Sequence, residues 1–292
     1  MSAASRDSHG PGRRTLREAV VFEGHGLHSG RSARVRVSPG RLGAGWRFDG
    51  VPREGWTTAA TELATTVGFG GRSVGTVEHL FAALTLADLD DLDLSLEGDE
   101  VPILDGSAAP FLEALEARVL VVPGPPTPAL RLEQAIVVEA VDGRIVAEAR
   151  PGLSPLLVVE ARWPGCAGGR LEVDLSVPET RSRLARARTF GFVSTVDALR
   201  ARGRALGADA TCCIGLDDSG WPVPETPLRF EREPLWHKAL DLLGDLARLP
   251  CRLELRVEAV GAGHTLHARL VDRLRSLSPS EGRPRLETSP GF

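Results

Sequence analysis

The sequence predicts an α+β protein built from two units. Each half of the 292-residue chain repeats one pattern, in which strand-like segments are followed by helix-like segments. Between the halves, the stretch VPGPPTP at residues 122–128 has the proline content of a short, stiff linker. Hydrophobic residues make up 42% of the chain and charged residues 25%, as is typical of globular domains. We therefore expect a first α+β domain over residues 13–121 and a second over residues 129–277.

The two ends of the chain differ in composition from the rest. Residues 1–12 are small and polar, so we expect a disordered tail there, and residues 278–292 are expected to form a second polar tail. The sequence has no secretory signal and no apolar run near the roughly 20 residues that span a bilayer. The four cysteines form no CxxC pair, which indicates reduced thiols in a cytoplasmic protein. A net charge of -4 argues against a general nucleic-acid binder.

In the first half, residues 15–23 and 31–37 alternate in the manner of half-buried strands. They are separated by the Gly-rich turn GHGLHSG at residues 24–30, which contains His25 and His28. The simplest interpretation of both histidines is a polar loop. The second interpretation is that His28 lies near a substrate.

A helix is expected after residue 76. Residues 68–75, GFGGRSVG, are expected to form a loop, and Thr76 then caps the helix. Glu78 and His79 lie in its first turn. Such a pair is a weak signal by itself, because acidic residues are common in first turns for reasons of the helix dipole.

The remaining elements continue the alternation of strands and helices. They are a strand over residues 91–98, a helix capped by Ser107, strands over 130–141, 144–149 and 155–163, a helix over 179–187, a sharp junction at 187–192, a helix over 193–202, strands over 214–216 and 251–260, and a helix that begins at His264.

One segment of the second half, LRFEREPLWHKALDLLGDL at residues 228–246, is predicted to be a buried helix. His237, Asp241 and Asp245 recur every four residues, so successive side chains are rotated by only about 40° and share one face. Buried carboxylates and imidazoles need partners or a metal ion, and a His–Asp pair at i, i+4 can bind one ion. An ordinary His–Asp pair on a helix surface is the alternative.

The same helix carries the chain's single lysine. Of 35 lysine and arginine residues, only Lys238 is a lysine, and it directly follows His237. A compact ammonium and a guanidinium are not interchangeable where a point charge must fit a tight site. A lysine at this position therefore indicates that the helix takes part in the chemistry of a site. The alternative is that the lysine occurs there by chance.

A catalytic zinc site needs three protein ligands and one open position. His79, His237 and Asp241 would supply two imidazoles and one carboxylate if their segments met. Hydrolysis of an amide also needs a base for water, donors for the oxyanion and an acid for the leaving amine. Glu78 is of a suitable type for the base, Lys238 and Thr189 for the oxyanion donors, and His264 for the acid.

Several common catalytic motifs are missing from the sequence. It contains no P-loop, no G-x-G-x-x-G in a strand–helix context, no H-E-x-x-H and no G-x-S-x-G. These absences remove the usual nucleotide-hydrolase, dinucleotide, zincin and α/β-hydrolase interpretations.

Five motifs occur in order: TVEH at residues 76–79, DGSAAPF at 105–111, RTFGF at 188–192, HKALDLLGD at 237–245 and GH at 263–264. In this combination they resemble the UDP-3-O-acyl-N-acetylglucosamine deacetylase family of lipid A biosynthesis, with similarity from about residue 13 to residue 271. Each motif alone is weak, whereas the combination is highly specific. The resemblance implies two α+β domains of similar topology, each a β-sheet layered with helices, and an active site in the cleft between them.

The resemblance also implies a role for each matched residue. In that family one zinc ion is held by the residues that match His79, His237 and Asp241; a site of this composition also accepts iron(II). Glu78 matches the general base that activates water. The other matches are the acid His264, its carboxylate partner Asp245, and the oxyanion-stabilising Lys238 and Thr189. The implied reaction is hydrolysis of the N-acetyl group of UDP-3-O-acyl-N-acetylglucosamine, with release of acetate.

An acyl-chain passage is implied in the segment that follows RTFGF. The matching apolar side chains, for which core packing is an equally compatible role, are Phe190, Phe192, Val196, Leu199 and Ala205. His28 is a further candidate for substrate contact. With a UDP-linked, acylated amino sugar as partner, we expect a monomer that makes at most peripheral membrane contact and binds no nucleic acid.

Some segments depart from the family pattern outside the proposed ligands, base and acid. The stretch EARWPGCAGGR at residues 160–170 replaces an Asp-x-x-His-Pro-like segment, Trp236 replaces a basic residue, and His267 replaces an Asn. These departures motivate a second hypothesis, a paralogous zinc amidase that deacetylates another N-acetylated amino sugar. A third, a non-catalytic binding protein with the same fold, is disfavoured because every candidate catalytic residue is present.

Overall fold

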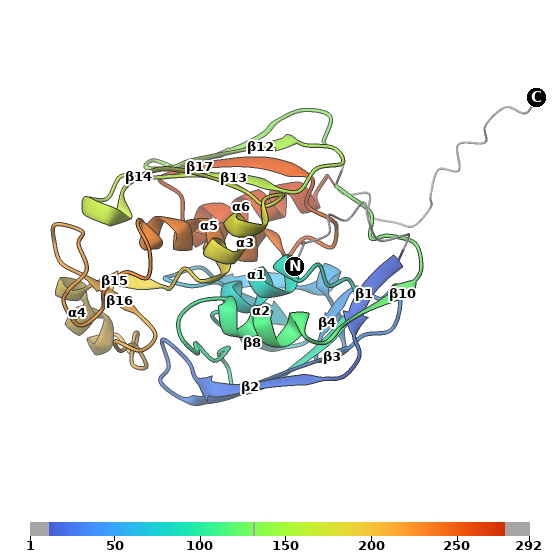
Figure 1. The fold of residues 1–292 in the computed structure, drawn as a ribbon, viewed down its shortest axis with the longest axis horizontal. Coiled ribbons are helices and arrows are strands. Elements are labelled where there is room, and N and C mark those ends of the chain that lie inside the picture. Colours follow the sequence, from blue (N-terminus) through green and yellow to red (C-terminus); the bar gives the residue numbers. More distant parts are fainter. Residues whose placement is uncertain (1–11, 131, 278–292) are drawn as a thin grey trace, which may run out of the picture.

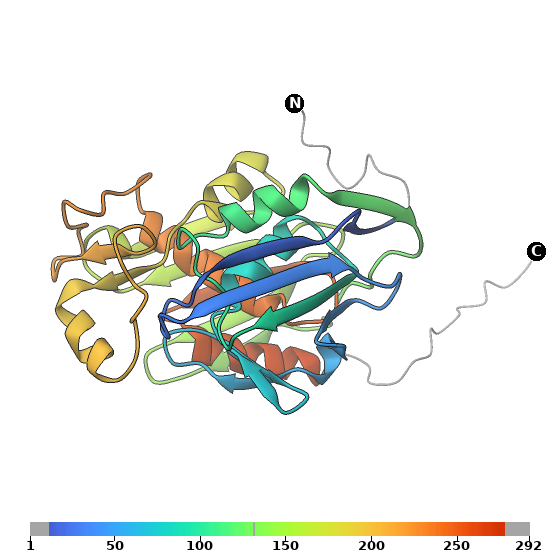
Figure 2. The ribbon, with the colours of Figure 1, turned by 90° about the horizontal axis from the view of Figure 1, so that it is seen from below.

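Two five-stranded sheets form the outer layers of the molecule, and the long helices lie between them (Figure 1). The computed structural model describes residues 12–130 and 132–277. The two predicted tails, apart from Gly12, lie outside the described residues. Figure 2 shows the strands of the first sheet running across the helices that they cover. The α+β class predicted from the alternation of strands and helices is confirmed.

The first sheet has the strand order β2-β3-β9-β4-β5. Its central strand β9 is antiparallel to β3 on one side and parallel to β4 on the other. The strands are β2 (Val20–His25), β3 (Ser32–Pro39), β4 (Trp46–Phe48), β5 (Val51–Pro52) and β9 (Leu92–Glu97).

The second sheet repeats this arrangement with the order β11-β12-β17-β13-β14. Its central strand β17 is antiparallel to β12 and parallel to β13. The strands are β11 (Ile136–Glu139), β12 (Arg144–Ala149), β13 (Leu156–Ala161), β14 (Gly169–Asp174) and β17 (Leu255–Val260). The pairing pattern of the two sheets is the same, so the units have similar topology, as the family resemblance implied.

In each unit one helix precedes the central strand and another follows it. These helices are α1 (Glu78–Leu86) and α2 (Ala109–Glu116) in the first unit, and α5 (Glu233–Leu246) and α6 (His264–Arg275) in the second. Helices α1 and α5 pack against each other. Their apolar side chains, Phe81 and Leu240 among them, belong to one continuous buried cluster that includes both halves of the chain.

Each unit also has an insertion before its first long helix. In the first unit it comprises the short helix Arg53–Gly55 and a three-stranded sheet, β6 (Thr57–Ala60), β7 (Thr66–Phe69) and β8 (Arg72–Val74). In the second unit it comprises α3 (Pro178–Ala185), β15 (Phe190–Phe192), the short helix Val193–Thr195, α4 (Val196–Ala201) and β16 (Ile214–Leu216). Strands β15 and β16 pair in parallel.

Two predicted elements of the first half are wrong in detail. The strand expected at 15–23 is two strands, because β1 (Gly12–Leu16) leaves the sheet to pair with β10 (Val119–Pro123), and the chain between β1 and β2 is exposed. The loop expected at 68–75 is a hairpin of β7 and β8. Gly70 and Gly71 have φ values of 52° and 81°, as the tight turn requires.

Thr76 does not cap helix α1. Its own φ is 54°, in the left-handed region, and its hydroxyl donates to Glu100 Oε1 at 2.7 Å. The helix begins after Val77. The prediction was wrong because a tertiary partner takes the hydroxyl that would have capped the helix.

The predicted linker begins inside a strand. Val122 and Pro123 are the last residues of β10 and pair with Arg13 and Gly12. The domain boundary at residues 122–128 therefore stays a prediction. Among the described residues, no helix is both long and apolar enough to cross a membrane.

Candidate metal centre

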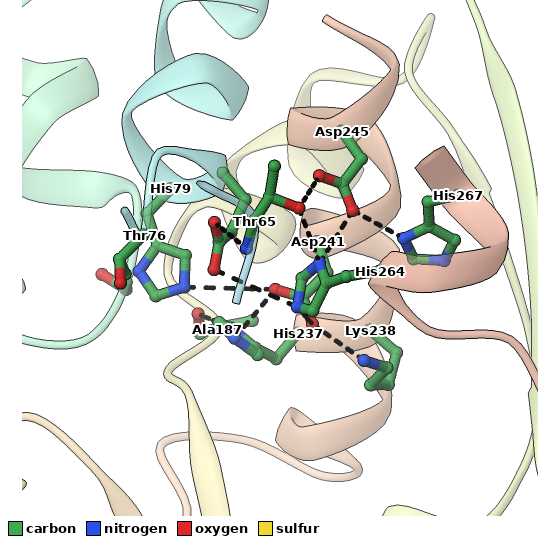
Figure 3. Close-up of polar contacts among 12 residues, drawn as sticks. Thr65, Thr76, His79, Ala187, His237, Lys238, Asp241, Asp245, His264 and His267 are labelled. Atoms are coloured by element: carbon green, nitrogen blue, oxygen red, sulfur yellow. Dashed lines mark hydrogen bonds and ion pairs between the residues drawn. The ribbon is translucent and has the colours of Figure 1, made fainter. Parts of the chain in front are cut away.

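A buried group of polar side chains lies where the first turn of α1 meets the middle of α5 (Figure 3). Gly244 permits this close approach, because a Cβ atom at that position would lie 2.0 Å from the carbonyl oxygen of Glu78. Glycine is unfavourable inside a helix by about 1 kcal/mol relative to alanine. Its presence here is explained by the backbone of α1, which occupies the space of a side chain.

His79, His237 and Asp241 form a group that can hold a metal ion, with one donor atom from each within 4.8 Å of the others. Asp241 Oδ1 lies 3.2 Å from His237 Nε2 and 4.0 Å from His79 Nε2. The two imidazole planes are nearly perpendicular, at 89°, with centroids 4.9 Å apart. All three residues are less than 5% exposed.

The protonation of the two histidines fits metal binding. His237 Nδ1 lies 3.0 Å from the carbonyl oxygen of Ala187 and therefore donates its proton, which leaves the Nε2 lone pair free. Burial, with a contribution from His237, lowers the pKa of His79 to about 3, so this ring is neutral at pH 7. Two imidazole nitrogens and a carboxylate oxygen are a donor set suited to a divalent transition metal.

Lys238 lies against the carboxylate of this group. Its Nζ atom donates to Asp241 Oδ2 at 2.9 Å. Burial alone would raise the pKa of Asp241, but the charge of Lys238 and the neighbouring His237 hold it well below its usual value. Asp241 is therefore ionised, and its Oδ2 atom holds the Lys238 ammonium in place.

Glu78 is almost completely enclosed, with 2% of its surface exposed. Its Oε2 atom accepts a hydrogen bond from the backbone N–H of Thr65 at 3.1 Å, and its Oε1 atom lies 4.0 Å from His264 Nε2. Burial raises the pKa of Glu78 to about 8 in the metal-free protein. A carboxyl group with a raised pKa beside metal-type ligands has the properties of a proton-transferring residue.

His264 faces the metal group through its Nε2 atom, while its Nδ1 atom is held by a hydrogen bond. Its Nδ1 atom donates to Asp245 Oδ2 at 2.8 Å, and its Nε2 atom lies 3.9 Å from Asp241 Oδ2. Burial alone would lower the pKa of His264, but the Asp245 carboxylate raises it to about 9. At neutral pH the ring is an imidazolium with one N–H held by Asp245 and the other directed toward the metal group.

Three residues of this neighbourhood were missed by the sequence-based prediction as contributors. The hydroxyl of Thr65 donates to Asp245 Oδ1, and His267 Nδ1 donates to Asp245 Oδ2 at 2.8 Å. The ring of Trp163 lies 5.9 Å from Lys238 Nζ. The i, i+3 spacing of His264 and His267 was the one available signal for this set, since it puts both rings on one helix face.

The residues after Ala187 border the metal group. Thr189 is half-buried, and its backbone N–H donates to Gly106 in the first unit at 2.8 Å. The Phe190 ring centroid lies 6.2 Å from that of His237. Phe192 and Val196 follow on the second insertion and are also half-buried. Trp163 packs edge-on against both phenylalanines.

His28 and Ala205 lie next to each other. The backbone N–H of Ala205 donates to His28 Nδ1 at 3.4 Å, and the backbone N–H of His28 donates to Glu100 at 2.9 Å. The Nε2–H of His28 is buried and has no partner among the described residues. Burial lowers the pKa of His28, so the ring is neutral. This pair joins the turn at residues 24–30 to the second insertion.

The arrangement as a whole has the parts of a hydrolytic site. A carboxyl group and an imidazolium face each other at 4.0 Å beside a three-donor metal group, and an ammonium lies at its edge. Such a set can hold a Lewis acid, take a proton from water and return a proton to a leaving group.

Comparison with known proteins assigns the chain to a family. The model of the UDP-3-O-acyl N-acetylglycosamine deacetylase family matches residues 13–276. The UDP-3-O-acyl-N-acetylglucosamine deacetylase of Thermosynechococcus vestitus is 38% identical over 266 residues, which cover 88% of this chain and 92% of that protein. The enzyme of the same name from Oleidesulfovibrio alaskensis is 34% identical and covers 87% and 85%, and that from Citrifermentans bemidjiense is 34% identical and covers 89% and 88%.

Every element that carries the buried group lies within the matched residues, from α1 to α6. The residues matched by the family model, 13–276, include both sheets and both insertions. The chain belongs to the UDP-3-O-acyl N-acetylglycosamine deacetylase family.

Proposed function

We propose that this chain is a zinc-dependent deacetylase that hydrolyses the N-acetyl group of UDP-3-O-acyl-N-acetylglucosamine and releases acetate, a step of lipid A biosynthesis. The observation that carries the proposal is the meeting of Glu78 and His264 beside three metal-type donors. The names of the relatives, which match over most of the chain, specify the substrate.

The metal would be held by His79, His237 and Asp241. Two imidazoles and one carboxylate are a common ligand set of catalytic zinc, and iron(II) fits the same donors. A divalent cation held there would lower the pKa of water and of the Glu78 carboxyl, and it would polarise the acetyl carbonyl.

Glu78 is the general base of the proposal. Its Oε1 atom takes a proton from water as the water oxygen forms a bond to the acetyl carbon. The Thr65 N–H at 3.1 Å holds the other carboxylate oxygen, so the receiving atom is aimed inward. Enclosure of the carboxyl group keeps bulk water from competing for the proton.

His264 is the general acid. It holds a proton on Nε2 at neutral pH because the Asp245 carboxylate raises its pKa to about 9, against the opposing effect of burial. Transfer of that proton to the amide nitrogen allows the C–N bond to break, and acetate and the free amine are the products. Lys238 and Thr189 are proposed to stabilise the negative charge that develops on the acetyl oxygen.

The substrate contacts are proposed along the second insertion. Phe190, which lies beside His237, and the half-buried Phe192 and Val196 that follow it offer apolar surface for the acyl chain. Ala205 and His28 border the same insertion, and the unpartnered Nε2–H of His28 is available as a donor. We further propose that the protein acts in the cytoplasm as a monomer with at most peripheral membrane contact.

A deacetylation assay with purified protein tests the proposal. The wild type is expected to release acetate from UDP-3-O-acyl-N-acetylglucosamine. Glu78→Gln is expected to keep its metal and to lose about a hundredfold or more in kcat. Retention of full activity by Glu78→Gln would contradict the assignment of the base.

A second candidate is deacetylation of another N-acetylated amino sugar. It is favoured by one observation: Trp163, in a segment that departs from the family pattern, contacts Phe190, Phe192 and Lys238. Comparison of 3-O-acylated and non-acylated UDP-N-acetylglucosamine separates the two candidates. Equal turnover of both substrates would favour the second.

A further inference from the structure

The Asp245 carboxylate is completely buried and accepts hydrogen bonds from three residues in two separate parts of the structure (Figure 3). The hydroxyl of Thr65, in the first insertion, donates to Oδ1. His264 and His267, both on α6, donate from Nδ1 to Oδ2 at 2.8 Å each. Asp245 therefore holds two imidazoles on a single oxygen.

The two imidazoles have different surroundings beyond Asp245. His264 directs Nε2 toward Glu78 and Asp241, at 4.0 and 3.9 Å. His267 is 1% exposed, and its ring Nδ1 is directed at Asp245. The ring planes are 80° apart, so the two N–H donors approach Oδ2 from different directions.

We propose that His267 is a positioning residue, which fixes the Asp245 carboxylate so that Oδ2 holds His264 with Nε2 directed at the reacting centre. The inference rests on the proposed function of His264 as the general acid. His267 does not touch the substrate in this scheme and acts only through Asp245.

The physical reason is the rotational freedom of a carboxylate. A carboxyl group turns about its Cβ–Cγ bond, and the energy profile of that rotation is broad. If only Thr65 bonded Oδ1 and only His264 bonded Oδ2, the carboxylate could rotate and Oδ2 could move together with the His264 ring. A second donor on Oδ2, from a ring held by the α6 backbone, defines both the plane of the carboxylate and the position of that oxygen. Charge-assisted hydrogen bonds of this kind are short and directional.

Three substitutions at position 267 separate the hydrogen bond from the packing. In His267→Asn the side-chain Nδ2 lies nearly where the imidazole Nδ1 lay, so the donor to Asp245 is kept. In His267→Gln the amide nitrogen lies one bond farther out, so the variant stays polar but misplaces the donor. His267→Leu fills a similar volume with no donor. Arg269→Asn, an exposed residue of the same helix, is the matched control.

We expect His267→Asn to keep kcat within about threefold of the wild type. The Gln and Leu variants should lose about 10- to 100-fold in kcat with little change in KM, as is typical when a residue that orients a catalytic group is removed. Metal content and thermal unfolding are measured on each full-length, metal-loaded protein. Arg269→Asn is expected to match the wild type in all of these.

An NMR measurement tests the same contacts without any substrate. In the wild type, the Nδ1–H protons of His264 and His267 should give two slowly exchanging, strongly downfield imidazole signals. His267→Asn should remove one and leave the His264 signal in place, whereas His267→Gln and His267→Leu should also broaden or abolish the His264 signal. If the wild type gives these spectra but does not deacetylate the sugar, the proposed function fails and the positioning role stands.

Three results would overturn the inference. One is full kcat in His267→Leu with an intact His264 signal. Another is a loss in His267→Asn as large as that in His267→Leu, because the donor to Asp245 would then be irrelevant. The third is a loss of kcat that follows loss of metal or of folded protein in every variant, which would make His267 an ordinary core residue.

Discussion

Helices α1 and α5 occupy equivalent places in two units of the same strand order, yet they contribute different chemistry. Helix α1 contributes Glu78 and His79 from its first turn. Helix α5 contributes His237, Asp241 and Asp245 from successive turns, all buried. The two units therefore share their arrangement of strands and helices, but their equivalent helices carry different polar residues. The donor set of His79, His237 and Asp241 is completed only by contact between the two units, because His79 comes from the first and the other two residues from the second.

The insertions of the two units differ as well. The first is a small sheet that delivers Thr65 to both Glu78 and Asp245. The second contains the parallel strand pair β15 and β16 with helices α3 and α4, and it has an apolar cluster of its own around Ile214 and Leu216. The insertion of the first unit thus contacts the buried carboxyl groups of Glu78 and Asp245, whereas the insertion of the second unit forms an apolar cluster.

Beyond the site, the units are joined by guanidinium groups at the carboxyl end of α5. Arg53 in the first unit donates to the carbonyl oxygen of Ala247 at 2.8 Å, and Arg248 donates to Thr58 Oγ1 at 2.6 Å. Arg275, on α6, donates to the carbonyl oxygen of Arg53 in the first unit at 3.3 Å and to that of Arg248 at 2.7 Å. Cations are favourable at the negative end of a helix, so these contacts hold the orientation of α5 against the first unit.

The largest expected effect comes from removing one ligand from each unit. His79→Ala and His237→Ala should both reduce metal content from about one ion per chain to well below half, and should lower kcat by at least about a hundredfold. Metal analysis of purified protein and a deacetylation assay measure this. His25→Ala, at the end of β2, is the control. Stoichiometric metal in either ligand variant would show that one unit binds the ion without the other.

The next effect tests a buried ion pair of the first unit. Asp91 is completely buried and accepts from Arg13 Nε at 2.5 Å and Nη2 at 2.8 Å. Asp91→Asn leaves the Arg13 charge buried without its partner, so the free energy of unfolding should fall by about 3–5 kcal/mol. Denaturant titration measures it. A loss below about 1 kcal/mol would mean that water reaches the guanidinium.

Gly244→Ala tests how closely the two helices must approach. The added Cβ would lie 2.0 Å from the Glu78 carbonyl oxygen, so α1 must shift. We expect a loss of about 1–3 kcal/mol in the free energy of unfolding. The displaced base should also cost about tenfold or more in kcat. Gly191→Ala, where a Cβ meets nothing within 4 Å, is the control for stability. An unchanged kcat would show that the position of Glu78 tolerates movement of α1.

The smallest effect concerns an ion pair of the second unit, more exposed than that of Arg13 and Asp91. Arg150 Nη2 donates to Asp174 Oδ2 at 2.8 Å, and the hydrogen bond from Arg150 lowers the pKa of Asp174 to about 2 from 3.8. The side chains are 20% and 30% exposed, so we expect Asp174→Asn to cost less than about 1 kcal/mol at pH 7.

The sign of the pH dependence follows from the lowered pKa of Asp174. The stability that it contributes is present above the unfolded-state pKa and is lost as pH falls through the folded-state value. The difference in unfolding free energy between wild type and Asp174→Asn should therefore shrink as pH falls from about 5 toward 3. Denaturant titrations at both pH values measure it, and a difference that grows on acidification would contradict the assignment.

Much of this molecule follows from local rules. Alternating apolar residues predicted most strands of both sheets, because each strand buries one face against the helices. The four-residue spacing of His237, Asp241 and Asp245 was sufficient to place them on one helix face, because helix geometry is the same wherever the helix packs. The match of motifs along the chain supplied the proposed partners Glu78 and His79.

Other features depend on contacts between segments far apart in sequence. Thr76 has the type of a helix cap, but Glu100 takes its hydroxyl. Thr65 gave no signal in the sequence, and it reaches Asp245 only because the first insertion packs over α5. Hydrophobic periodicity determines which face of an element is buried, whereas the partner of a buried polar group depends on which elements pack together. The sequence alone could therefore determine the elements and the candidate ligands. The hydrogen bonds of Thr65, His264 and His267 to the Asp245 carboxylate were decided by the tertiary structure.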